Sequence, residues 1–149
     1  MQTVTTKDEA ETFALGRALG AAAFPGAVFA LAGDLGAGKT VLARGIAAGL
    51  GVSRGVASPT FVLMATHTQG RLPLAHADLY RLTSEDDLVS VGLSEAFDDG
   101  GVVIVEWADR FPNALPDDRL EVVLSGDESR VITLTAHGPA HAPLEAVRA

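Results

Sequence analysis

The stretch GDLGAGKT, residues 33–40, carries the residue types that phosphate binding needs. It fits the pattern G-x-x-x-x-G-K-[ST], with Gly33, Gly38, Lys39 and Thr40 in the fixed positions. Glycines permit positive φ and a close approach of phosphate, so that successive backbone N–H groups form an anion nest ahead of a helix. Lys39, one of only two lysines in the chain, adds a charge for the β- and γ-phosphates, and the Thr40 hydroxyl suits Mg²⁺. The stretch predicts a nucleotide-binding P-loop rather than an ordinary glycine turn.

Two acidic residues are candidates for the metal and water side of such a site. Glu106 follows the apolar run VVIV, residues 102–105, which indicates a carboxylate at the carboxyl edge of a sheet, beside the phosphates. In HADLYR, alternation places His76, Asp78 and Tyr80 on one face of a strand. We expect Asp78 to position water or act in the outer shell of Mg²⁺. A single histidine on a strand is usually structural, so His76 is the weaker candidate for a catalytic base.

Other nearby positions have less definite roles. Thr60, in SPTF at residues 58–61, follows the predicted P-loop helix, where segments that sense the γ-phosphate often lie; a plain Ser-Pro turn is the alternative. Alternation along the strand turns Trp107 to the face opposite Glu106, which favours a role in core packing or at a partner surface. No arginine finger is identifiable in the chain, although Arg54 and Arg81 are conceivable.

The elements that must position these residues can be read from apolar runs and turn signals. The first half predicts a short strand near Val4, a helix from a Thr6–Glu9 capping box to about residue 22, a buried strand at 27–32, and a helix after the P-loop that ends at Gly51. The second half predicts a hairpin about Gln69-Gly70, a short helix from Ser84, a buried strand leading to Glu106, and a hairpin about Gly126-Asp127. Together they predict an α/β fold: a single P-loop NTPase-like domain, residues 1–149, with a mixed parallel/antiparallel sheet flanked by helices.

Composition narrows the class of protein. The 149 residues include 48% hydrophobic but only 5% aromatic residues, which predicts one aliphatic core. No cysteine is present, so no disulfide partner is expected, and no apolar run approaches the roughly 18 residues of a membrane span. The N-terminus is polar and acidic, unlike a signal peptide, so a cytoplasmic protein is expected. A net charge of −8 without a basic cluster disfavours direct, strong binding of RNA or DNA.

The chain resembles members of the TsaE family in its motifs. These are small bacterial P-loop ATPases required for threonylcarbamoyladenosine modification of tRNA beside the anticodon. The resemblance rests on GDLGAGKT, SPTF, HADLYR and VEW, in that order, and covers about residues 7–136. It implies ATP and Mg²⁺ as cofactors, and the TsaB and TsaD proteins as partners, with TsaD making the transfer to tRNA. It also implies that ATP hydrolysis drives a conformational or turnover step of that assembly.

The resemblance assigns roles residue by residue. Positions that match the family's nucleotide loop are Leu35, Gly36, Ala37, Gly38, Lys39 and Thr40. Thr40 and Glu106 match its metal positions, and Asp78 matches an acid implicated in hydrolysis. Glu9 and Arg130 fall near positions that the family uses around the nucleotide. We therefore expect Lys39, Asp78 and Glu106 to be the catalytic set, and slow hydrolysis in the absence of partners.

Other P-loop functions remain as alternatives. A small-molecule kinase would share the loop but usually carries an arginine-bearing lid, and the segment after SPTF has few basic residues. A GTPase would need an [NT]-K-x-D segment to read guanine, and no lysine follows Lys39. A nucleotide-sensing binding module would bind without turnover, and only measured hydrolysis separates it from an ATPase.

Overall fold

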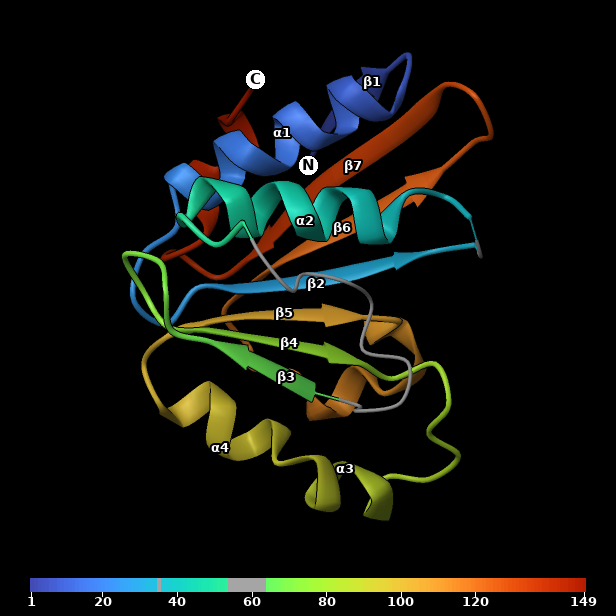
Figure 1. Ribbon diagram of the computed structural model, residues 1–149. Coiled ribbons are helices and arrows are strands. Elements are labelled where there is room, and N and C mark those ends of the chain that lie inside the picture. The colour runs from blue at the N-terminus through green and yellow to red at the C-terminus, as the bar shows by residue number, and fades with distance from the viewer. Residues whose placement is uncertain (35, 54–63) are drawn as a thin grey trace.

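The computed structural model describes residues 1–34, 36–53 and 64–149, which form a seven-stranded sheet with helices on both faces (Figure 1). Leu35, Arg54 and the SPTF segment with Thr60 lie outside the described residues. The strands are β1 (Gln2–Thr6), β2 (Val28–Gly33), β3 (Met64–His67), β4 (Leu74–Asp78), β5 (Val102–Glu106), β6 (Arg119–Ser125) and β7 (Arg130–His137). The α-helices are α1 (Glu9–Ala21), α2 (Lys39–Gly49), α3 (Asp86–Val91) and α4 (Leu93–Asp98). Short 3₁₀ turns are η1 (Ala108–Arg110), η2 (Pro112–Ala114) and η3 (Ala142–Ala146).

The sheet is mixed, as predicted. Its strand order is β1-β7-β6-β2-β5-β4-β3, and β6, β2, β5 and β4 run parallel to one another. The strands β3, β7 and β1 join antiparallel at the two edges. Because β2 lies between β5 and β6, its carboxyl end and the loop that follows lie at the centre of the parallel part of the sheet. The carboxyl ends of β4 and β5 open onto the same edge, where parallel sheets place their ligands.

Central strands are covered on both faces, which explains their continuous apolar runs. Along β2, Phe29 and Leu31 pack into the core beneath α1 and α2, whereas Val28 and Ala30 belong to the core on the opposite face. Figure 1 shows α1 and α2 on one side of the sheet and α3 and α4 on the other. None of the helices in the described part of the chain is long and apolar enough to cross a bilayer.

The helices α1 and α2 pack with their backbones in close contact. A Cβ added at Gly20 would lie 2.0 Å from the carbonyl oxygen of Ile46, and one at Gly45 would lie 2.3 Å from that of Phe13. Only glycine permits this approach, so these positions hold α2, and with it the preceding loop, close to α1.

The predicted start of α1 was wrong by two residues. Asp8, not Thr6, is the N-cap, because its side chain accepts a hydrogen bond from the Glu11 backbone N–H at 2.9 Å. Glu11 in turn accepts from the Lys7 backbone N–H at 2.8 Å. Thr6 still belongs to β1, and its hydroxyl is buried 2.7 Å from that of Thr12. The strand therefore continues to the point where the local pattern predicted a cap.

The C-terminal segment, which no sequence pattern assigned, packs against the sheet. Leu144 in η3 enters the core beneath α1 and α2. His141 is 1% exposed, and its Nε2 accepts a hydrogen bond from the Val28 backbone N–H at 2.9 Å. Its Nδ1 lies 2.6 Å from the carboxylate of Asp118, to which it donates, since an ionised carboxylate only accepts. The bonds of His141 thus join this segment to the start of the central strand.

Candidate functional site

Three glycines at the junction of β2 and α2 adopt backbone angles that suit an anion nest. Gly33, Gly36 and Gly38 have φ of 141°, 81° and 104°, the region that residues with a Cβ rarely adopt. A Cβ at Gly33 would also lie 2.2 Å from the carbonyl oxygen of Leu124 on β6. Gly38 is the N-cap of α2, and no side chain caps that helix. The first N–H groups of α2 are thus left for another acceptor, which is the requirement for binding phosphate.

Lys39 lies in this loop with its side chain nearly buried. Its Nζ donates hydrogen bonds to the carbonyl oxygens of Gly33 at 2.6 Å and Asp34 at 2.8 Å. The same nitrogen lies 4.0 Å from the ring centroid of Trp107, a cation–π contact. Burial lowers the pKa of the Lys39 ammonium from its ordinary value, and the nearby carboxylates oppose that shift, that of Glu106 most strongly. These interactions therefore hold the Lys39 ammonium beside the glycine loop.

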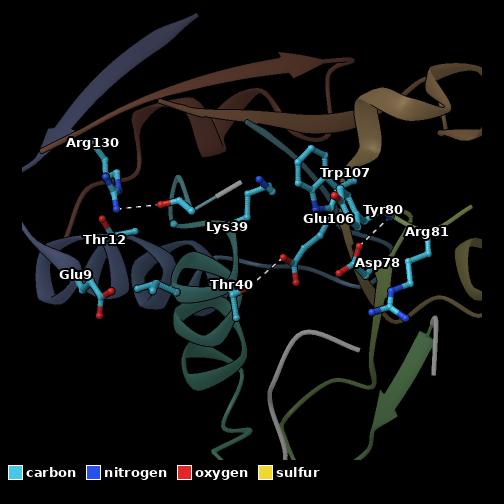
Figure 2. Close-up of a pocket in the computed structure, with 13 residues that line it drawn as sticks. Glu9, Thr12, Lys39, Thr40, Asp78, Tyr80, Arg81, Glu106, Trp107 and Arg130 are labelled. Carbon is cyan, nitrogen blue, oxygen red and sulfur yellow. Dashed lines mark hydrogen bonds between the residues drawn. The ribbon is translucent and has the colours of Figure 1, made fainter. Parts of the chain in front are cut away.

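Thr40 and Glu106 come together from α2 and the end of β5. The Thr40 hydroxyl donates to Glu106 Oε1 at 3.2 Å, and the two side chains point toward each other in Figure 2. Glu106 is 2% exposed, and its second oxygen, Oε2, lies 2.5 Å from Nε2 of His76. The predicted metal pair is thus in contact, and His76 is the further partner of the carboxylate.

Asp78 ends β4 beside Glu106, with which it is paired in the parallel register. Its Oδ1 accepts a hydrogen bond from the Tyr80 backbone N–H at 2.9 Å, which fixes the turn after the strand. The Tyr80 ring packs against Trp107 with 4.8 Å between ring centroids. The predicted water-positioning acid therefore lies at the same sheet edge as the metal pair.

A cavity of about 440 Å³ joins these residues. The side chains and loop positions that line it are Glu9, Thr12, Gly36, Gly38, Lys39, Thr40, Val41, Asp78, Tyr80, Arg81, Glu106, Trp107 and Arg130. In Figure 2, Glu9, Thr12 and Arg130 lie on one side of Lys39, and Asp78, Glu106 and Arg81 lie on the other. The predicted catalytic set, Lys39, Asp78 and Glu106, thus meets in one cavity.

Arg130 and Glu9, which the resemblance placed near the nucleotide, both line the cavity from distant elements. The Arg130 guanidinium donates to the carbonyl oxygens of Gly36 at 3.1 Å and Gly126 at 2.7 Å. It therefore ties Gly36 to the turn between β6 and β7. Glu9 is the first residue of α1, whose amino end faces the cavity. Ala37 is 2% exposed and belongs to the core, so it supports the loop through packing.

Trp107 packs against the core on the α3 and α4 side of the sheet, as predicted, but the prediction of its direction was wrong. Alternation turned it away from Glu106, but the side chain lines the same cavity as Glu106 and covers Lys39. The reason is that Trp107 has φ 58° and ψ 36°, the only non-glycine residue with positive φ in the described part of the chain. The strand ends at Glu106, and alternation does not extend beyond a strand.

Some residues of the cavity went unnoticed in the sequence. Thr12 lies within α1 and carries no motif, and its contribution depends entirely on how α1 packs against α2. Val41 lines the cavity as the residue that follows Lys39 and Thr40 on α2, so the loop pattern itself was a signal for it. By contrast, Arg81 was named in the sequence as a conceivable arginine finger, and it does line the cavity.

The donor set at this edge fits a magnesium nucleotide. The uncapped amino end of α2 and the Lys39 ammonium suit phosphate oxygens, and the Thr40 hydroxyl with the Glu106 carboxylate suits Mg²⁺, which prefers oxygen ligands. Among the residues that the structure describes, no group of three or more His, Cys, Asp or Glu side chains could hold a metal ion by itself. Mg²⁺ bound through one or two protein ligands would share its shell with phosphate oxygens and water.

Comparisons with known proteins identify the family of the chain and a solved structure with a similar fold. A profile of the family described as "Threonylcarbamoyl adenosine biosynthesis protein TsaE" matches residues 6–132. The tRNA threonylcarbamoyladenosine biosynthesis protein TsaE of Bacillus subtilis (strain 168) is 46% identical over 135 residues, 89% of this chain and 84% of that relative. The protein of the same name from a Nostoc species is 40% identical over 134 residues, 86% and 81% of the two chains. The crystal structure of Bacillus subtilis YdiB superposes with a TM-score of 0.82 at 40% identity, over 95% of this chain and 89% of that one.

Proposed function

The chain belongs to the TsaE family of tRNA threonylcarbamoyladenosine biosynthesis, and we propose that it binds ATP with Mg²⁺ and hydrolyses it slowly in that pathway. The observation that carries the proposal is the contact between Thr40 and Glu106 at the carboxyl edge of the sheet, in the same cavity as Lys39. A carboxylate, a hydroxyl and an ammonium at the end of a glycine loop are the groups that P-loop NTPases use on a magnesium nucleotide. The tRNA pathway indicates the cytoplasm as the compartment.

Each residue of the cavity has a defined part in this proposal. Lys39 and the first N–H groups of α2 would bind the phosphate oxygens, and Thr40 and Glu106 would hold Mg²⁺ directly or through water. When bound, that ion would neutralise charge that develops on the transferred phosphoryl group. Asp78, fixed by its bond from the Tyr80 N–H, would orient the attacking water. Trp107 and Tyr80 pack against each other and line this side of the cavity.

We further propose that turnover depends on a TsaB–TsaD complex and that tRNA is reached through it. The support is indirect: family membership, and a net charge of −8, which suits contacts with protein partners more than a direct grip on tRNA. Arg130 is engaged by the carbonyl oxygens of Gly36 and Gly126, so it is held at the loop rather than directed as a finger. An arginine finger contributes on the order of 10³–10⁵ in rate, so we expect slow hydrolysis by the isolated chain.

Calorimetry of ATP binding in Mg²⁺ tests the nucleotide site. We expect binding by the wild type and none by Lys39→Met. Lys7→Met is the matched control, because Lys7 is the other lysine, it is 75% exposed, and it forms only a surface ion pair with Glu11. Equal affinities of wild type and Lys39→Met would refute the site.

Hydrolysis assays test the reaction and its rivals. We expect phosphate release that rises when TsaB and TsaD are added, and tRNA modification that needs this chain for multiple turnovers. ADP release that depends on an added metabolite would instead indicate a kinase. Nucleotide binding with no hydrolysis, even with both partners and tRNA present, would indicate a sensing module and overturn the ATPase assignment.

A further inference from the structure

His76 and Glu106 form a buried pair from neighbouring parallel strands. His76 is 1% exposed and Glu106 2% exposed, and Nε2 of His76 lies 2.5 Å from Oε2 of Glu106. In the register of β4 and β5, His76 is paired with Ile104, and Glu106 is two residues farther along β5 on the same face. The contact is therefore a diagonal cross-strand pair that the sheet itself positions.

The two oxygens of the Glu106 carboxylate have different partners. Oε1 accepts from the Thr40 hydroxyl at 3.2 Å, whereas Oε2 accepts from His76. A carboxylate held through one oxygen cannot rotate about its last torsion without losing that bond. His76 therefore holds the carboxylate in the orientation that directs its other oxygen at Thr40.

We propose that His76 is a positioning residue for Glu106: it holds Oε2 so that Oε1 stays directed at Thr40, where Mg²⁺ would bind. This role rests on the proposed function of the site. Groups that orient a metal ligand from behind typically change metal affinity or activity by about 10–100-fold when they are removed. His76 would act on the metal through Glu106 and need not touch the nucleotide.

The orphaned nitrogen of His76 supports a role beyond packing. Its Nδ1 is buried and has no hydrogen-bond partner within the described ranges. A buried polar atom without a partner is destabilising, and an apolar side chain would fill the same space without that penalty. The bond to Glu106 is the interaction that the imidazole adds.

The test compares His76→Leu with His76→Gln. Leucine fills the site without a donor, whereas the side-chain amide of glutamine can extend an N–H toward the position of Nε2. ATP affinity is measured by calorimetry across a Mg²⁺ series and in EDTA, with thermal melting as a check on folding. For His76→Leu we expect a rise of about 10–100-fold in the Mg²⁺ concentration that gives half of the full increase in ATP affinity. The ATP affinity in EDTA should be unchanged. His76→Gln is expected to recover most of the difference.

A double-mutant cycle with Glu106→Gln separates positioning from packing. If His76 acts through the carboxylate, His76→Leu adds no further Mg²⁺ effect in the Glu106→Gln background. An undiminished effect in that background would overturn the role. Equal losses of ATP affinity with and without Mg²⁺ would also overturn the role. The same holds if His76→Gln needs as much Mg²⁺ for ATP binding as His76→Leu does. A wild type that binds ATP without any dependence on Mg²⁺ would refute the proposed metal site itself, and the positioning role with it.

Discussion

The Lys39 ammonium lies against the face of Trp107, with Nζ 4.0 Å from the ring centroid. Lys39 is the first residue of α2 and Trp107 directly follows β5, and both line the cavity. The ammonium group that we propose binds phosphate is thus in contact with the only tryptophan of the chain. This contact exists because Trp107 takes a left-handed backbone conformation that turns its ring over the loop.

Trp107 fluorescence should report nucleotide binding. We expect its emission to change saturably with ATP and Mg²⁺, because phosphate would compete with the ring for the Lys39 ammonium. Lys39→Met should abolish the change. Trp107→Phe identifies the source, since no other tryptophan is present. Constant emission under conditions where calorimetry shows saturation would mean that the two groups stay in contact during binding.

Asp78→Asn should separate hydrolysis from binding. The asparagine amide oxygen can still accept from the Tyr80 N–H, so the turn after β4 is preserved. We expect ATP affinity close to that of the wild type and a rate of phosphate release lower by about 10²-fold or more, with TsaB and TsaD present. Asp109→Asn, at an exposed acid that also faces Lys39, is the control and should retain activity. Equal rates for Asp78→Asn and wild type would remove Asp78 from the mechanism.

Arg130→Ala should weaken ATP binding without abolishing it. The substitution removes the bonds from the guanidinium to Gly36 and Gly126, which support the nucleotide loop. Since a hydrogen bond contributes about 0.5–1.5 kcal/mol, calorimetry should show affinity lower by up to about tenfold. Arg148→Ala, in the C-terminal tail, should leave affinity unchanged. The same loss in both variants would point to a general charge effect instead.

Gly45→Ala should destabilise the fold although alanine is the better helix former. The new Cβ would lie 2.3 Å from the Phe13 carbonyl oxygen and force α1 and α2 apart. Overpacking of this kind costs about 1–3 kcal/mol, more than the roughly 1 kcal/mol gained in helix propensity. Urea denaturation measures the difference, and Arg44→Ala, at the exposed neighbouring position, should stay within about 0.5 kcal/mol of the wild type. A Gly45→Ala protein as stable as wild type would show that the helices separate freely.

Asp118→Asn should change how stability depends on pH. The hydrogen bond from His141 lowers the pKa of the Asp118 carboxyl in the folded chain. A lowered acid pKa contributes stability above the unfolded value of about 3.9, and that stability is lost as pH falls through the folded pKa. The difference in unfolding free energy between wild type and Asp118→Asn should therefore be constant near neutrality and shrink below pH about 4. A difference that stays the same down to pH about 3 would contradict the assignment.

Much of the fold could be predicted because its signals are local. The apolar run before GDLGAGKT became β2, and Gly51 follows the end of α2. The hairpin turns at Gln69-Gly70 and Gly126-Asp127 also lie between the expected strands. Each of these signals depends on residues within a few positions of one another, so no knowledge of the packing was needed.

The sequence by itself determined the chemistry of the loop and the end of β5, because glycine, lysine, threonine and glutamate at fixed spacings have few other uses. Only the tertiary structure decided what surrounds them. The contact of His76 with Glu106 joins residues 30 positions apart, and that of Arg130 with Gly36 joins residues 94 apart. Such contacts depend on the order of strands in the sheet and on how the helices pack. Neither can be read from the periodicity of the sequence. The direction of Trp107 likewise depends on where β5 ends, which packing decides.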